Sequence, residues 1–182
     1  MKRVAIIGAP GSGKSTFARE LAEKTGLPLI HLDFYYHQTD KNYYENKEAW
    51  FARVKKIIAR DEWIMDGNYS TTIPERLARA DIIIYFDLPR WLTMYRVLKR
   101  RVEFGGQKKR QDMPDDWREK LDWAFLKHVW NHKKRSTTVQ KIEKSMNDKN
   151  KSQKIMHFTS SRQAQNYLKQ LQRADNFRIG RQ

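Results

Sequence analysis

The stretch that decides the fold is residues 2–16, KRVAIIGAPGSGKST, where a short apolar run leads through glycines to a lysine. The β-branched composition of residues 2–7 is typical of a buried strand. From Lys14 to Lys24 the apolar residues recur at the spacing of an amphipathic helix, and Gly26 is placed to end that helix. A glycine-rich turn between a strand and a helix lets backbone N–H groups and the helix N-terminus bind an anion together.

The turn itself, residues 8–15, matches the pattern G-x-x-x-x-G-K-[ST] of a nucleotide phosphate-binding loop (P-loop). Its glycines allow successive N–H groups to face a phosphate that a Cβ atom would obstruct. Lys14 is predicted to contact the β- and γ-phosphates of ATP, and the Ser15 hydroxyl is predicted to bind Mg²⁺. The predicted nucleotide-binding residues are Gly8, Ala9, Pro10, Gly11, Ser12, Gly13, Lys14, Ser15 and Thr16, the last as a contact for the α-phosphate.

Outside the loop, expected strands alternate with expected helices. Further strands are predicted at residues 27–32, 62–65, 81–86 and 154–158. Helices are predicted at 47–60, 74–80 and 89–103, from 117 past 142, and through 167–171. Residues 33–46 show no hydrophobic periodicity and are expected to be irregular. Residues 173–182 are expected to form a flexible tail. This alternation predicts an α/β fold, a five-stranded parallel sheet with helices on both faces, as a single domain over residues 1–172.

The carboxyl ends of parallel strands share one edge of a sheet, and this edge is where α/β proteins bind ligands. Three carboxylates are expected there with Gly8. Asp66 follows an apolar strand, so it is a candidate to hold Mg²⁺ through water or, alternatively, to cap a turn. Asp33 is a candidate to accept a proton from a substrate hydroxyl or to bind metal indirectly, and the alternative is a loop cap. Asp87 fits a helix N-terminal cap.

Two basic residues, Arg96 and Arg100, lie four positions apart on a predicted helix and can reach one anion from the same face. Alternatively, the two arginines belong to a basic helix face that is exposed to solvent. His128 and His132 have the same spacing, but without a third ligand they do not predict a zinc site. Trp117, Trp123 and Trp130 are expected to pack in the core and between helices.

Composition narrows the class of protein further. The 182 residues contain no cysteine, which excludes a disulfide scaffold, a thiolate zinc site and a cysteine nucleophile. The longest apolar runs are too short for a membrane span, so we expect no membrane partner and a cytoplasmic location. The net charge of +16 is uneven, because residues 96–182 hold 23 basic and 9 acidic side chains, against 14 and 12 in residues 1–95. The basic half suits either phosphorylated substrates or a nucleic-acid partner.

These motifs resemble those of adenylate kinase and the nucleoside monophosphate kinases. Besides GAPGSGKST, the segment IMDG at 64–67 is similar to their strand ending in Asp-Gly, and IYFDLPRWLTMYRVLKRR at 84–101 is similar to the strand and helix leading into their lid. The resemblance implies a P-loop NTPase fold with a short lid at about residues 104–116. It also implies that Arg96 and Arg100 contact the phosphates of ATP, with Arg110 and Arg118 as further candidates.

More narrowly, HLDFYY, WIMDGNYS with RLARAD, and RQDMPDDWREKLDWAFLKHVWN resemble the adenylate-kinase-related DNA topology modulation proteins. The arginine that grips a monophosphate acceptor after Asp-Gly in adenylate kinases is missing, since Asn68 follows Gly67. The expected function is therefore a kinase that moves the γ-phosphoryl group of ATP·Mg²⁺ to an unidentified small acceptor, with Lys14, Asp33, Asp66, Arg96 and Arg100 as catalytic candidates. The alternative is a nucleic-acid-binding NTPase linked to DNA topology, in which residues 96–182 contact the DNA backbone.

Overall fold

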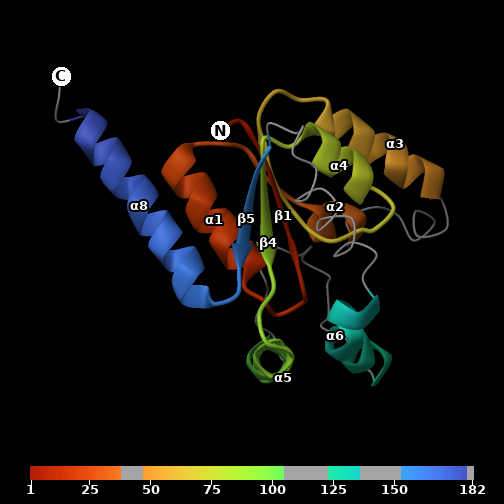
Figure 1. The fold of residues 1–182 in the computed structure, drawn as a ribbon. Coiled ribbons are helices and arrows are strands. Elements are labelled where there is room, and N and C mark those ends of the chain that lie inside the picture. Colours follow the sequence, from red (N-terminus) through yellow and green to blue (C-terminus); the bar gives the residue numbers. More distant parts are fainter. Residues whose placement is uncertain (38–46, 105–122, 136–152, 180–182) are drawn as a thin grey trace.

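A parallel sheet in the order β2-β3-β1-β4-β5 forms the centre of the molecule (Figure 1). The computed structural model describes residues 1–37, 47–104, 123–135 and 153–179. The strands are β1 (Arg3–Gly8), β2 (Leu29–His31), β3 (Trp63–Asp66), β4 (Ile82–Phe86) and β5 (Lys154–Phe158). All neighbouring strands pair in parallel, as predicted, and β1 lies between β3 and β4.

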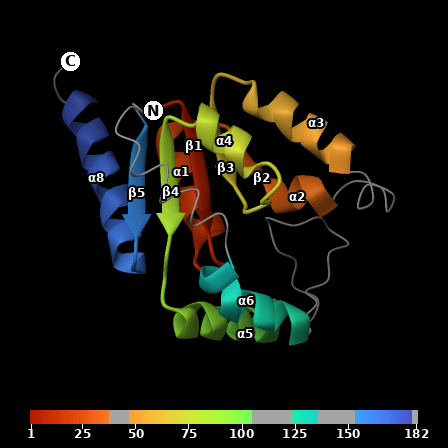
Figure 2. The same ribbon diagram turned by 45° about the vertical axis from the view of Figure 1, so that its right-hand side comes forward.

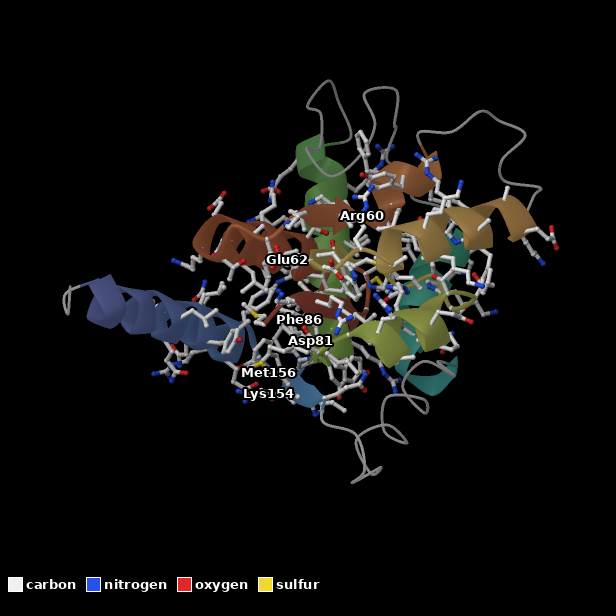
Figure 3. All side chains as sticks on the ribbon, turned by 90° about the horizontal axis from the view of Figure 1, so that it is seen from above. Arg60, Glu62, Asp81, Phe86, Lys154 and Met156 are labelled. Atoms are coloured by element: carbon white, nitrogen blue, oxygen red, sulfur yellow. The ribbon has the colours of Figure 1, made fainter. Side chains whose placement is uncertain are left out.

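Helices cover both faces of this sheet. The helices α1 (Lys14–Thr25) and α8 (Ser161–Ile179) lie on one face, and α3 (Lys47–Ile58) and α4 (Ile73–Arg79) lie on the other (Figures 1 and 2). Viewed from above, the labelled residues Glu62, Asp81 and Lys154 follow one line between the two helical layers (Figure 3). The predicted three-layer α/β architecture is confirmed.

Alternation along the strands divides the core in two, because successive strand residues point to opposite faces. On β1, Ala5 and Ile7 pack with Trp50 and Val54 of α3, whereas Val4 and Ile6 belong to the cluster formed with α1 and α8. Every one of these strand residues is fully buried. Burial on both faces explains why the strands are continuous apolar runs.

Two further helices, α5 (Arg90–Phe104) and α6 (Trp123–Arg135), lie together at the end of the sheet to which the strand arrows point (Figure 2). They therefore stand beside the carboxyl edge, where the loop between β1 and α1 is also found. None of the described helices is long and apolar enough to cross a membrane.

Three sequence expectations were wrong in part. Residues 33–37 were expected to be irregular but belong to a helix, α2 (Leu32–His37). The ring of Tyr36 on this helix packs with its centre 5.1 Å from that of Trp50, a contact that the local sequence does not reveal. The second is the end of the last helix, which was expected before residue 173, since α8 continues to residue 179; the flexibility expected of residues 173–182 stays a prediction. Third, Trp123 and Trp130 are 81% and 48% exposed, so they are not core residues. The expected lid at 104–116 lies almost wholly outside the described residues, as do Arg110, Trp117 and Arg118.

Candidate nucleotide site

The P-loop has a backbone that only glycine adopts readily at three positions. Gly8, Gly11 and Gly13 have φ angles of +147°, +76° and +92°. A Cβ atom on Gly11 would also lie 2.5 Å from the carbonyl oxygen of Thr93 on α5. The loop is thus shaped by its glycines and packed directly against α5, and it retains the cradle that the motif predicts for a phosphate.

The side chains that follow Gly13 occupy the first turn of α1. Lys14 donates from Nζ to the carbonyl oxygen of Ala9 at 2.9 Å, which holds its ammonium over the loop. Ser15 and Thr16 come next in the same turn, with Ser15 half-buried and Thr16 exposed. An open backbone cradle, a lysine held across it and a hydroxyl in the adjoining helical turn together fit the phosphates of ATP with Mg²⁺.

Asn68 holds the start of this loop in place. Its Oδ1 accepts from the N–H of Gly8 at 3.1 Å, and its Nδ2 donates to the carbonyl oxygen of Gly8 at 2.7 Å. Gly8 is buried, so this one side chain satisfies both polar groups of a backbone unit that water does not reach freely. Sequence reasoning missed Asn68 and noted only that no arginine stands there.

Asp66 lies beside the loop at the end of β3. It is 5% exposed, and its Oδ2 is 3.2 Å from Nδ1 of His31, its register partner on β2. Its buried Oδ1 has no hydrogen-bond partner among the described residues. An orphaned carboxylate oxygen next to the phosphate cradle fits a water ligand of Mg²⁺, the place predicted for it.

Arg76, which sequence reasoning also missed, supports the turn after Asp66 from α4. It is fully buried and donates to the carbonyl oxygens of Gly67 and Asn68, both at 2.7 Å. Burial lowers the pKa of Arg76 to about 10, an effect opposed by the negative charges of Asp66 and other acidic neighbours. The guanidinium therefore stays charged at neutral pH and fixes the turn that carries Asp66 and Asn68.

Asp33 lies in the first turn of α2, one strand further from the loop than Asp66. Beside it is an aromatic group in which the Tyr36 and Tyr69 rings are 4.8 Å apart and the Arg53 guanidinium lies 5.2 Å from the Tyr35 ring centre. Asp87, at the end of β4, is 3.3 Å from Nε2 of His157, and its predicted capping role stays a prediction.

Arg96 reaches the loop from α5. Its guanidinium lies 3.5 Å from the carbonyl oxygen of Ser12 and donates to Oγ of Ser161 at 2.8 Å. Arg100, one turn further along α5, is half-buried. The structure thus places Arg96 at the loop beside Lys14, while the predicted phosphate contacts of both arginines stay predictions.

His128 and His132 share one side of α6, with ring centres 6.1 Å apart. Nε2 of His132 lies 3.4 Å from the amide nitrogen of Asn68. Within the described part of the chain, no three histidine or acidic side chains gather in a way that could hold a metal ion. The Mg²⁺ prediction rests instead on Ser15, Asp66 and the phosphates of the nucleotide.

Comparison with known proteins agrees with this geometry. No family model matches the chain. An adenylate kinase from Thermotoga neapolitana is 31% identical over 81 residues, and those from Thermotoga petrophila and Thermotoga maritima are 32% identical over 81 residues. Each match covers 44% of this chain and 36% of the relative, so the similarity spans about a third of those adenylate kinases.

Two solved structures match nearly the whole chain. A shikimate kinase from Acinetobacter baumannii in complex with shikimate superposes with a TM-score of 0.55 at 15% identity, covering 98% of this chain and 94% of that one. The shikimate kinase of Aquifex aeolicus gives 0.51 at 14% identity, with 97% and 98% covered. The chain has the P-loop NTPase fold. Part of its sequence is similar to adenylate kinases, and the narrower resemblance to DNA topology modulation proteins stays a prediction.

Proposed function

We propose that this protein is a P-loop kinase that transfers the γ-phosphoryl group of ATP·Mg²⁺ to a small acceptor. The observation that carries the proposal is the glycine cradle of the P-loop with Lys14 held across it and the buried, half-satisfied carboxylate of Asp66 beside it. Similarity to adenylate kinases in sequence and to shikimate kinases in fold supports the same class of reaction.

In this proposal the chain's own residues bind and orient the reactants. The loop N–H groups and Lys14 bind the β- and γ-phosphates, while Ser15 and, through water, Asp66 hold Mg²⁺. Mg²⁺ held by these residues would neutralise charge on the phosphates. Arg96 and Arg100 approach from α5 and stabilise negative charge on the transferred group.

We further propose that the acceptor carries a neutral hydroxyl group rather than a second phosphate. Among the described residues, Asp33 follows β2, one strand beyond the strand that ends at Asp66, and the two terminal nitrogens of Arg76 face backbone carbonyls. A carboxylate such as Asp33 can accept the proton of a hydroxyl group, which a phosphate dianion does not offer. The hydroxyl oxygen would bond to the γ-phosphorus as the bond to the β-phosphate oxygen breaks, ADP would leave, and the hydroxyl proton would pass to Asp33.

A phosphoryl-transfer screen tests this proposal. Purified protein is incubated with ATP, Mg²⁺ and separate pools of hydroxyl-bearing metabolites, nucleosides and nucleoside monophosphates, with Lys14→Ala as the blank. We expect ADP formation above the blank with a hydroxyl-bearing pool, and a large loss of kcat in Asp33→Asn. Turnover confined to nucleoside monophosphates would refute the hydroxyl acceptor, and no Lys14-dependent transfer to any pool would refute the kinase.

The second candidate function is a nucleic-acid-binding NTPase, favoured by the concentration of positive charge in residues 96–182. Binding through phosphate contacts would weaken log-linearly with salt, whereas transfer to a small acceptor would not depend on DNA. ATP hydrolysis that rises many-fold with added DNA and falls steeply with salt would favour this function over the kinase.

A further inference from the structure

One titratable side chain at the P-loop has no part in the proposed reaction. His132, on α6, lines a small cavity together with Ala9 of the loop, Asp87 at the end of β4, and Arg90 and Thr93 of α5. It reaches this place because α6 lies along α5 at the carboxyl edge of the sheet (Figure 2). The carbonyl of the same Ala9 accepts from Lys14, so the cavity brings His132 to the part of the loop over which the Lys14 ammonium lies.

Hydrogen bonds fix which nitrogen of His132 carries a hydrogen. The Oδ1 of Asn68 accepts from the N–H of Gly8, so the amide cannot be flipped and its other atom is the nitrogen. That nitrogen donates one hydrogen to the Gly8 carbonyl at 2.7 Å and lies 3.4 Å from Nε2 of His132. Since the Asn68 nitrogen can only donate, Nε2 of His132 accepts, and the imidazole hydrogen is on Nδ1.

The surroundings of His132 keep the ring neutral. Burial, together with the smaller effects of the positive charges of Lys14 and His128, lowers its pKa to about 4 against the opposing charge of Asp87. A neutral ring keeps its Nε2 lone pair for Asn68 at neutral pH.

We propose that His132 binds the terminal phosphate of ATP, donating from Nδ1–H to a phosphate oxygen while Nε2 stays on Asn68. This inference rests on the proposed nucleotide binding and deepens it. Lys14 is the residue of the motif expected to contact the β- and γ-phosphates, and it donates to Ala9, which lines the same cavity as His132. A neutral imidazole adds a hydrogen bond to the phosphate at this place.

The experiment compares the affinities of ATP and ADP by calorimetry, without turnover, for the wild type, His132→Leu and His132→Asn. His132→Leu should bind ATP about tenfold more weakly and ADP unchanged, because only ATP carries the terminal phosphate. His132→Asn places an amide near the position of Nδ1 and should recover most of the ATP affinity. The matched control is His128→Gln, an exposed position one turn before His132 on α6, which should bind both nucleotides like the wild type.

A histidine ¹H–¹⁵N spectrum of the wild type gives a second readout that needs no variant to fold. It should show Nδ1 protonated and Nε2 unprotonated, with the Nδ1 signal shifting on addition of ATP far more than of ADP. An Nε2–H tautomer, or equal ATP and ADP losses in His132→Leu, would overturn the inference. Unchanged ATP affinity in His132→Leu would refute only the role of His132, whereas a wild type that binds neither nucleotide would refute the nucleotide site as well.

Discussion

Replacing Asn68 by alanine tests whether one side chain holds the P-loop to the end of β3. The substitution removes the hydrogen bonds at 3.1 Å and 2.7 Å that satisfy the N–H and carbonyl of Gly8. Each bond contributes about 1 kcal/mol net, and leaving a buried partner unsatisfied adds to that loss, so we expect a total of about 3 kcal/mol. For a chain of this size such a loss lowers Tm by roughly 6–12 °C.

Urea unfolding of Asn68→Ala measures the loss directly, with Ser70→Ala, an exposed site in the same turn, as the matched control. Asn68→Asp sharpens the test, because aspartate still accepts from the Gly8 N–H but places a second oxygen against the Gly8 carbonyl. It should therefore be less stable than the alanine variant at neutral pH. A loss below about 0.5 kcal/mol in Asn68→Ala, within the range of ordinary surface substitutions, would refute this reasoning.

Two further predictions concern the loop and the opposite edge of the sheet. Gly11→Ala should destabilise the protein by about 2 kcal/mol more than Gly26→Ala. Both glycines have a positive φ, but only a Cβ atom on Gly11 would lie 2.5 Å from the Thr93 carbonyl oxygen. Equal urea midpoints for the two variants would contradict this prediction. Burial raises the pKa of Asp81, yet the hydrogen bonds donated mainly by Arg3 outweigh it and hold the pKa below its usual 3.8. The Asp81 carboxylate therefore stabilises the fold at pH values above its pKa in the unfolded chain, and this stabilisation is lost as the pH falls through its pKa in the folded protein. Asp81→Asn should be less stable than wild type at pH 7 and approach it near pH 3 in urea unfolding; a constant difference would argue against the pairing.

Strands β1 and β4 could be predicted from the sequence because they are buried on both faces. Four or five consecutive apolar residues between turn residues leave little alternative, and β4, Ile82–Phe86, is buried along its whole length. Helix α2 has no such signature. Tyr36 is placed by Trp50 and Tyr69, residues that are distant in sequence, so the helix depends on contacts that no local pattern contains.

The site could be predicted only where a motif marks it. The P-loop is recognisable because every one of its residues acts within one short stretch, whereas Asn68, Arg76 and His132 act through partners on other elements. Asn68 carried one available signal, its place directly after a strand and Gly67 at the carboxyl edge. Trp123 on α6 shows the opposite failure, because its large aromatic side chain was expected in the core and is 81% exposed.

Strand order, which the sequence does not reveal, determines how the predicted carboxylates divide their work. In the order β2-β3-β1-β4-β5, the P-loop strand has β3 and β4 as its neighbours. Asp66 therefore ends the strand next to the loop, while Asp33 begins the helix after β2, one strand further away. A residue that holds the metal ion of ATP must lie beside the phosphates, and a base for the acceptor must lie beyond the terminal phosphate, in line with the bond that breaks. The order of the strands thus supports Asp66, on the strand next to the loop, for the metal and Asp33 for the acceptor.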